Sequence, residues 1–376
     1  MNVISFLTVL ELLEHQHRFL YLLTDLTLKS SFIFILAFVI YLLIPRQNAT
    51  TKSMLWKVAF TSLFFLPVFH ELLPAIDIPI AYEQTLSTAI SINDAKPFSE
   101  IFLLQANAMA NSLFGASLSY ALVSLLLLCH LFTGVLKVIA LSHRSLPFKH
   151  EVARQHLLHL RELNGISSPV ELLVSPHIVS PITWGIWRHK IIFPLIANGW
   201  DSKLLEQTIS HELGHIQRKD WLSQIISRFV ICLYWINPLA WIAYRKLLIE
   251  CEKACDDIAV DNTDCSISYA RNLVQLAGNI SQHKPLFALA LFKLRSDLSK
   301  RIHYILKPNQ SHYCNDNCNI LPCLVVTLLI AAPFSTLNLN IEIIEQPILR
   351  SSPFSVKFYP GDSKEFDSLM AEFSQL

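Results

Sequence analysis

Two histidines and a glutamate occur in the order His211, Glu212, His215, within the stretch ISHELGHIQRKD at 209–220. Residues four apart lie on the same face of a helix, so the two imidazoles can bind one metal ion together. Glu212 lies beside the first histidine, where it can act as a base on a water at the metal. Chance alone places this pattern in roughly 3% of chains of this composition. The pattern therefore indicates a zinc-dependent hydrolase. The surrounding sequence must decide whether the pattern is a metal site or a chance occurrence.

A catalytic zinc site needs a third protein ligand and one open position. The stretch NPLAWIAYRKLLIECEKACDD, at 237–257, is predicted to form the helix that supplies this ligand, with Asn237 as its cap. Glu252 and Asp256 lie four apart on this helix. One carboxylate can therefore bind the metal while the other accepts a hydrogen bond from a ligand histidine.

Three alternatives remain open on the same helix. Glu250 carries a carboxylate of the same kind, and Cys255 could bind metal through its thiolate. Glu252 and Asp256 could also be solvated carboxylates of a helix surface. The nearby pair of histidines favours the metal-site interpretation.

Short helices and strands are predicted to position these residues. The histidines fall on a helix that begins at Asp201 or Ser202 and ends near Arg218. A further helix and two strands are expected before it, the strands being short, rich in Val, Ile and Trp, and bounded by Pro or Gly; they lie at 151–163, 169–176 and 180–194.

The second strand is a candidate for substrate binding. If it forms a sheet edge around Trp184, Gly185 and Ile186, it can pair with an extended peptide. An ordinary core strand fits the sequence equally well.

The rest of the chain has the composition of a membrane protein. Apolar residues make up 52% and charged residues 16%, and the mean hydropathy is +0.42. Residues 1–28 are predicted to form an amphipathic interfacial segment. Four transmembrane helices are predicted, three of them within 29–141; they lie at 30–45, 58–76, 118–141 and 320–338. The stretch 222–243 could pass for another span, but a membrane-associated hairpin is preferred because it keeps Glu252 near the histidines.

Lysine and arginine residues predict the orientation in the membrane. The loop 46–57 contains three of them, the loop 77–117 contains one, and the stretch 142–319 contains twenty. We therefore expect a multi-pass protein of the bacterial inner membrane with a cytoplasmic catalytic domain at 142–319. The N-terminus, the loop 77–117 and the short tail 339–376 are expected outside.

Composition disfavours three classes of protein. A net charge of +1 gives no support to direct nucleic-acid binding. The eight cysteines fall mainly in predicted cytoplasmic or membrane segments, so no disulfide framework is expected, and Cys314 with Cys318 alone is a weak metal motif. The predicted spans carry few ionisable residues, which argues against a transporter.

The segments HELGHIQRKD, WINPLAW and ECEKACDDIAV together resemble the antirepressor membrane metallopeptidases of the BlaR/MecR type, peptidase family M56. The resemblance extends to SPITWGIWRHKIIFP and to LALFKLRSDLSKRIHYIL, and covers roughly 29–340. It implies a polytopic α-helical membrane protein with a cytoplasmic, gluzincin-like α+β zinc metallopeptidase domain between its third and fourth spans.

The resemblance also implies a role for each site residue. His211, His215 and Glu252 become the ligands of one zinc ion per chain. Glu212 becomes the general base, and Asp256 becomes the hydrogen-bond partner of a ligand histidine. Arg218 and Asp220 match family positions whose role is expected to be structural.

The implied function is a signalling endopeptidase, embedded among membrane lipids, that cleaves a cytoplasmic winged-helix repressor. Drug-sensing members carry an extracellular penicillin-binding domain after the fourth span. No Ser-x-x-Lys motif occurs in 339–376, so β-lactam sensing is not expected. The alternatives are a housekeeping protease of the Ste24/HtpX type and a non-catalytic membrane receptor or scaffold.

Overall fold

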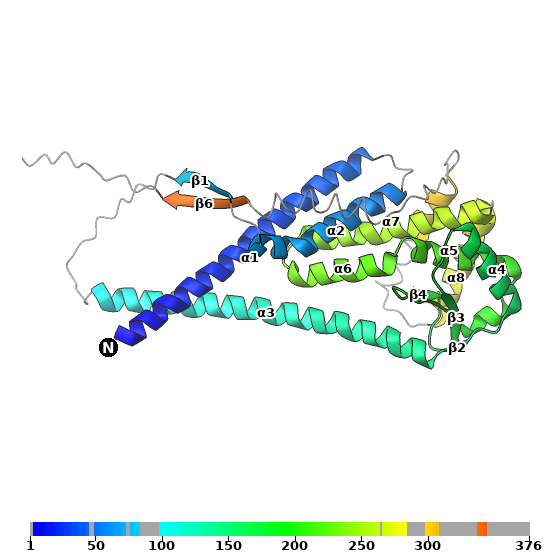
Figure 1. Cartoon of the computed structure of the whole chain (residues 1–376), viewed down its shortest axis with the longest axis horizontal. Helices are drawn as coiled ribbons and strands as arrows, with labels where there is room; N and C mark the ends of the chain where they lie inside the picture. Colours follow the sequence, from blue (N-terminus) through cyan, green and yellow to red (C-terminus); the bar gives the residue numbers. More distant parts are fainter. Residues whose placement is uncertain are drawn as a thin grey trace, which may run out of the picture. The chain divides into compact units, whose positions relative to one another are not determined.

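The computed structural model describes residues 3–44, 49–72, 76–82, 98–263, 265–283, 298–307 and 337–343 (Figure 1). It divides into two units. The smaller unit contains most of a two-stranded sheet that pairs β1 (Ile76–Tyr82) with β6 (Leu337–Ile343). The larger unit contains the helices and a four-stranded sheet. Of the predicted span at 320–338, only the last two residues are described, and they begin β6.

Three long helices form the apolar part of the larger unit. They are α1 (Val3–Leu43), α2 (Ala49–Leu72) and α3 (Phe98–Arg144). Within the described residues, three helical segments are long and apolar enough to cross a membrane: Leu22–Leu43, Ala49–Leu72 and Phe114–Arg144. Each overlaps one predicted span, but all three helices begin earlier than predicted, and α1 and α2 end a few residues before the predicted 45 and 76. Helix α1 passes position 28 without a break, and the interfacial location of 1–28 stays a prediction.

The predicted loop at 46–57 is wrong over most of its length, because α2 begins at Ala49. Its polar residues suggested a loop, yet Lys52 and Lys57 are 6% and 8% exposed. Lys52 lies 4.7 Å from the centre of the Tyr41 ring, and Lys57 pairs with a buried carboxylate. These two charged side chains can be buried on α2 because each has an interaction partner.

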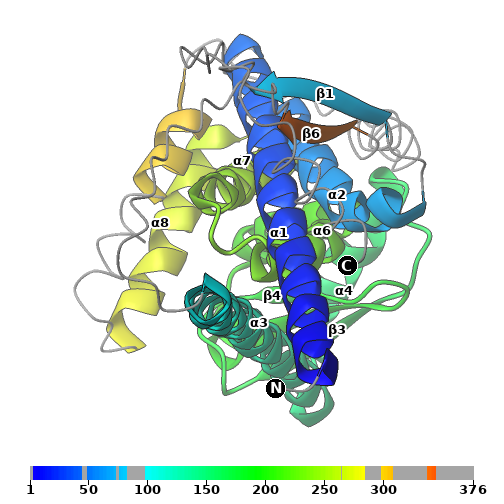
Figure 2. The same cartoon turned by 90° about the vertical axis from the view of Figure 1, so that its left-hand side faces the viewer.

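Helices α6 (Asp220–Leu233) and α7 (Pro238–Thr263) form the helical hairpin predicted around 222–243. Asn237 caps α7 by accepting a hydrogen bond from the backbone of Leu239 at 3.0 Å. Both helices pack on α2, and α1 lies beside α2 and α7 (Figure 2). Their shared core includes fully buried aromatic and aliphatic side chains: Phe34, Trp56, Phe60, Leu63, Val230 and Leu247.

The four-stranded sheet lies beside the zinc-motif helix. Its strands occur in the order β2-β3-β5-β4, with β3 parallel to β5 and β4 antiparallel to β5; they are β2 (Leu146–Pro147), β3 (Val170–Ser175), β4 (Ile182–Trp184) and β5 (His189–Pro194). The prediction of one strand over 180–194 is wrong, because the chain reverses after β4. Gly185 has a φ of +114°, and a Cβ there would lie 2.2 Å from the Arg188 carbonyl oxygen.

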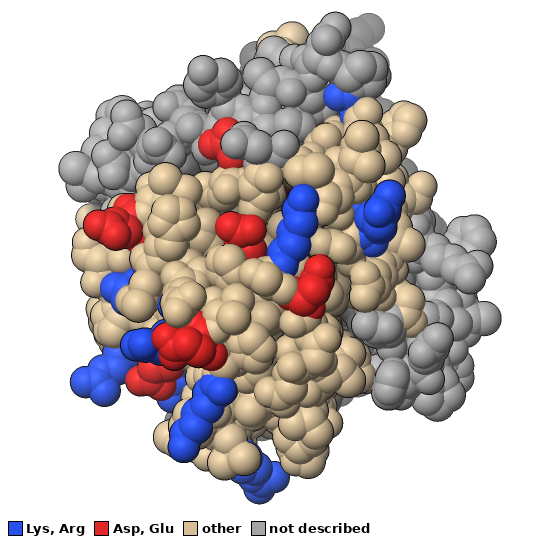
Figure 3. Space-filling view, turned by 90° about the vertical axis from the view of Figure 1, so that its right-hand side faces the viewer, with Lys and Arg blue, Asp and Glu red and all other residues tan. Residues whose placement is uncertain are grey.

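A second core packs this sheet against α4 (Glu151–Leu163) and α5 (Ser202–Gln217). Helices α4 and α5 each have one apolar face, whereas β5 is apolar and buried along most of its length; the buried members of this core include Leu160, Ile191, Phe193, Leu205, Ile209 and Leu213. The 3-10 helix η1 (Leu195–Gly199) joins β5 to α5. On the outer surface in Figure 3, basic and acidic side chains are interspersed.

Candidate metal centre

Helix α5 carries the two histidines on one face. Its first turn is capped by Asp201, whose carboxylate accepts a hydrogen bond from the Leu204 backbone at 3.3 Å, as the sequence predicts. The helix continues to Gln217, so His211 and His215 are one turn apart. Their ring centres are 5.0 Å apart. The i, i+4 spacing of the motif thus places the two imidazoles side by side, as predicted.

Gly214 lets α7 approach this helix closely. A Cβ at Gly214 would lie 3.2 Å from Ile258 and 3.3 Å from the Cys255 sulfur. This close packing brings Glu252 of α7 to the histidines. Its Oε2 is 3.6 Å from His211 Nε2, and its Oε1 is 3.7 Å from His215 Nε2.

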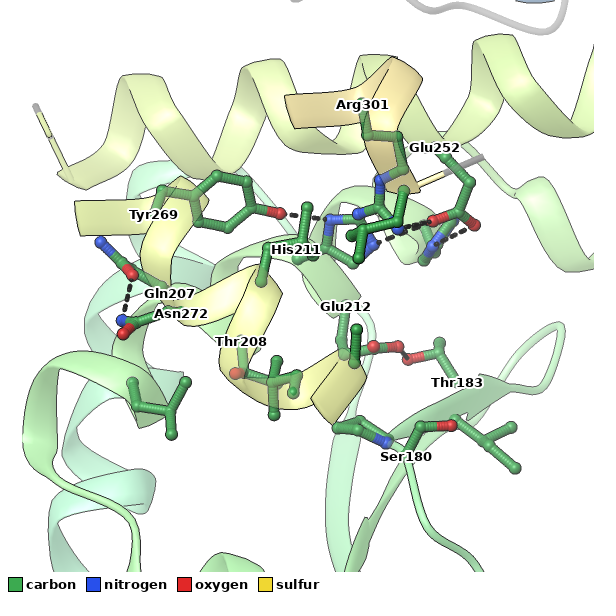
Figure 4. A pocket seen from close by; sticks show the side chains of 18 of the residues that line it. Ser180, Thr183, Gln207, Thr208, His211, Glu212, Glu252, Tyr269, Asn272 and Arg301 are labelled. Carbon is green, nitrogen blue, oxygen red and sulfur yellow. Dashed lines mark hydrogen bonds and ion pairs between the residues drawn. The ribbon is translucent and has the colours of Figure 1, made fainter. Parts of the chain in front are cut away.

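The three side chains fit a metal ion. One donor atom from each of His211, His215 and Glu252 lies within 4.8 Å of the others. Donors bound about 2.1 Å from a tetrahedral zinc ion are ~3.4 Å apart, close to the separations found here. Two imidazole nitrogens and one carboxylate oxygen are also a donor set that zinc accepts. Figure 4 shows His211 and Glu252 facing the same space.

The two competing ligands do not make the contacts with the histidine Nε2 atoms that Glu252 makes. Glu250 accepts hydrogen bonds from the Tyr41 hydroxyl at 2.9 Å and from Lys253 at 3.1 Å. Cys255 lies 3.3 Å from Nδ1 of His215, the ring nitrogen opposite the one that faces Glu252. Burial raises the pKa of the Cys255 thiol well above its usual range, which keeps it protonated. The geometry favours Glu252 over both residues.

Each histidine has a hydrogen-bond partner at Nδ1. Asp256 lies 3.3 Å and the Tyr269 hydroxyl 3.0 Å from Nδ1 of His211. Nδ1 of His215 lies 2.9 Å from Asp220 Oδ2. A ring that donates from Nδ1 keeps the Nε2 lone pair for a metal. The structure thus places Asp256 as predicted, and it adds Asp220 and Tyr269, which the sequence did not assign to the site.

Arg301 completes the charged network from the helical segment at 298–305. Its guanidinium donates to both oxygens of Asp256 at 2.5 and 2.8 Å, and it lies 2.9 Å from Glu252. Burial alone would raise the pKa of Glu252, but Arg301 and the histidines lower it to about 2. Both carboxylates are therefore held ionised and oriented.

The carboxylates make the histidine pair a favourable place for positive charge. Burial lowers the pKa of His211, but its hydrogen bonds to Asp256 and Glu252 outweigh that effect and raise the pKa to about 10. The pKa of His215 is also raised: burial lowers it, and the contact with Asp220 more than compensates. A divalent cation between the rings would supply the same positive charge without the protons.

Glu212 faces a cavity of about 760 Å³ beside the histidines. Its Oε2 accepts a hydrogen bond from the Thr183 hydroxyl of β4 at 2.5 Å (Figure 4). The cavity is lined by β4 and the segment before it, by one face of α5, by α8 (Ser266–His283) and by Arg301. The glutamate and the three candidate ligands thus line one cavity, which is large enough for a peptide side chain.

The structure places the predicted substrate contacts beside this cavity. Residues 180–183 line it, whereas Trp184 is the last residue of β4. Gly185 and Ile186 border a small adjoining hollow that also reaches His215. Strand β4 is hydrogen-bonded within the sheet to β5 alone, so it is an edge strand. Peptide contact at 184–186 stays a prediction.

A histidine pair with a glutamate between them, a carboxylate on a helix packed against theirs and apolar membrane-length helices together fit a membrane metallopeptidase. The family model described as BlaR1 peptidase M56 matches residues 21–305, about three quarters of the chain. The chain belongs to this family, which confirms the resemblance read from the sequence.

Similar proteins of known name cover smaller parts of the chain. It is 26% identical over 170 residues to the methicillin resistance mecR1 proteins of Staphylococcus aureus and Staphylococcus epidermidis, covering 44% of this chain and 29% of each relative. It is 34% identical over 90 residues to the regulatory protein BlaR1 of Bacillus licheniformis, covering 24% of this chain and 15% of that protein. The alignments therefore span less than a third of these relatives. The relationship and the apolar helices identify a membrane protein.

Proposed function

We propose that this protein is a membrane zinc endopeptidase that cleaves a cytoplasmic protein during signal transduction. The observation that carries the proposal is the convergence of His211, His215 and Glu252 on one point, with Glu212 beside it. The partners at each Nδ1 and the Arg301 contacts support it, because they orient all three ligands before metal binds.

When bound, zinc would polarise the scissile carbonyl and lower the pKa of the attacking water. Glu212 takes the proton from this water and later delivers it to the leaving nitrogen. The Thr183 hydroxyl holds one carboxylate oxygen of Glu212, which leaves the other oxygen for the water. The side chains of Asp256 and Asp220 keep the imidazoles in place throughout.

The substrate is proposed to bind as an extended strand. Among the described strands, β4 is the edge of the sheet next to Glu212, so a peptide can add to the sheet there. The cavity beside α5 and α8 would receive a side chain of that peptide. This arrangement selects an unfolded or flexible segment of the substrate protein.

A transcriptional repressor of the winged-helix type is the proposed substrate. Its relatives include methicillin resistance proteins and a regulatory protein, and basic residues predict that the peptidase domain is cytoplasmic. Housekeeping proteolysis in the manner of Ste24/HtpX proteases is the rival function, and membership of the M56 family favours signalling over it.

The test compares cells carrying the wild type, Glu212→Ala and the control Glu206→Ala. Glu206 lies on the same helix, 3.9 Å from His156 and away from the cavity. Glu212→Ala should keep zinc and abolish cleavage, since it removes only the base. Proteomes should then show one stabilised repressor and a narrow set of silenced genes. General accumulation of membrane-protein fragments without a discrete set of silenced genes would contradict the signalling function.

A further inference from the structure

We infer that Lys57 of the membrane helix α2 is a positioning residue for His215, acting through Asp220. The inference deepens the proposed function, because it names the contact by which a membrane helix controls a candidate zinc ligand.

Helix α2 contacts the turn that follows the zinc-motif helix. Lys57 donates hydrogen bonds to Asp220 Oδ1 at 2.6 Å and to the Arg218 carbonyl oxygen at 2.7 Å. One helical turn earlier, Ser53 accepts a hydrogen bond from the Arg218 guanidinium. Ser53 and Lys57 are four residues apart and therefore lie on the same face of α2. This face contacts Arg218 and Asp220 together.

The turn between α5 and α6 contains a residue in a strained backbone conformation. Lys219, between Arg218 and Asp220, has a φ of +51°, and it is the one non-glycine residue with positive φ among the described residues. A residue in this conformation persists where its surroundings fix it. The contacts from α2 to the residues on either side of Lys219 are such a constraint.

Asp220 then links α2 to the metal site. Its Oδ1 meets Lys57, while its Oδ2 lies 2.9 Å from Nδ1 of His215. The carboxyl side chain is 1% exposed, so no bulk water competes for either oxygen. Because both oxygens are engaged, the position of the carboxylate sets the position and hydrogen-bond direction of Nδ1 of His215. The direction of Nε2 toward Glu252 follows from it.

A small movement of α2 would break this chain of contacts. Hydrogen bonds of this kind have donor–acceptor distances of about 2.7–3.2 Å, so a shift of ~1–2 Å is enough to break them. The polar links between α1 and α7 do not offer the same route. They end on Glu250, reached from Tyr41, and on Asn237, reached from Ser30. An ionisable residue inside an apolar helix commonly marks a functional site, and Lys57 fits that rule.

The experiment measures zinc affinity of the full-length protein in lipid nanodiscs by competition with a chelator. Lys57→Met removes both contacts that Lys57 makes with the turn and leaves the Ser53 contact with Arg218. Loss of the partner that orients a ligand typically costs 10–100-fold in metal affinity; Lys57→Met keeps that partner, Asp220, but removes its anchor, so we expect a loss of ~10-fold, at the lower end of that range. Lys52→Met is the matched control, because Lys52 is equally buried on α2 but lies against Tyr41. Its affinity should equal that of the wild type.

The visible absorption spectrum of the cobalt-loaded protein distinguishes a change in the position of His215 from a general loss of folded structure. In the cobalt-loaded protein, Lys57→Met should change the visible absorption bands, because His215 changes its angle at the metal, while Lys52→Met should not. Lys57→Gln provides a milder change if Lys57→Met does not fold, and it too should weaken zinc binding.

Folded Lys57→Met or Lys57→Gln protein with the affinity and spectrum of Lys52→Met would overturn the inference. A wild type that binds no zinc would instead overturn the proposed function on which it rests.

Discussion

Glu212 and Thr183 show how a catalytic residue depends on a neighbour that is remote in sequence. Thr183 Oγ1 lies 2.5 Å from Glu212 Oε2, across the gap between β4 and α5. We expect Thr183→Val to keep zinc and lower kcat by about 10–100-fold, because a hydrogen bond to a charged group contributes about 1.5–3 kcal/mol. Steady-state kinetics on a peptide substrate would measure this change. Unchanged kcat would show that Thr183 does not position the base.

Local spacing made part of the site predictable. The i, i+4 relationships of His211 with His215 and of Glu252 with Asp256 survive in the structure because each pair lies on one helix. The roles of Thr183, Tyr269 and Arg301 could not be predicted from spacing. They reach the site from β4, α8 and the helical segment at 298–305, and only packing of these elements on α5 and α7 brings them together.

Strand β4 depends on one glycine. The apolar stretch 180–194 predicts a continuous strand, and the turn was missed because its signal is the single residue Gly185 between aromatic and β-branched neighbours. Helix α2 was also predicted too short, since Lys52 and Lys57 look like loop residues until their buried partners are known. In both cases tertiary contacts override the local pattern.

Substitution Gly185→Ala tests the importance of this turn. The positive φ and the contact with Arg188 should cost about 1–3 kcal/mol and displace β4. We expect a raised KM and a lower melting temperature, with zinc content unchanged. Gly199→Ala is the control, because a Cβ at Gly199 meets no atom within 4 Å. Equal KM values for the two variants would show that β4 does not contribute to substrate binding.

At the scale of the whole molecule, the predicted orientation needs a direct test. Lys52 and Lys57 were counted as loop residues, and their burial weakens that part of the charge argument. The basic residues of 142–319 still predict a cytoplasmic peptidase domain. Asn198 is exposed in η1, so Asn198→Cys should react with a membrane-impermeant thiol reagent only after the inner membrane is opened. Labelling in intact spheroplasts beyond the level of the wild type would place the domain outside.

The metal content of the purified full-length protein tests most directly whether this site is a zinc centre. We predict one zinc per chain in the wild type, retention of zinc in Glu250→Ala, and loss of zinc in Glu252→Ala. Glu252 alone of these two glutamates faces both histidine Nε2 atoms, whereas Glu250 faces Tyr41 and Lys253. Loss of zinc in Glu250→Ala with retention in Glu252→Ala would contradict the proposed metal centre.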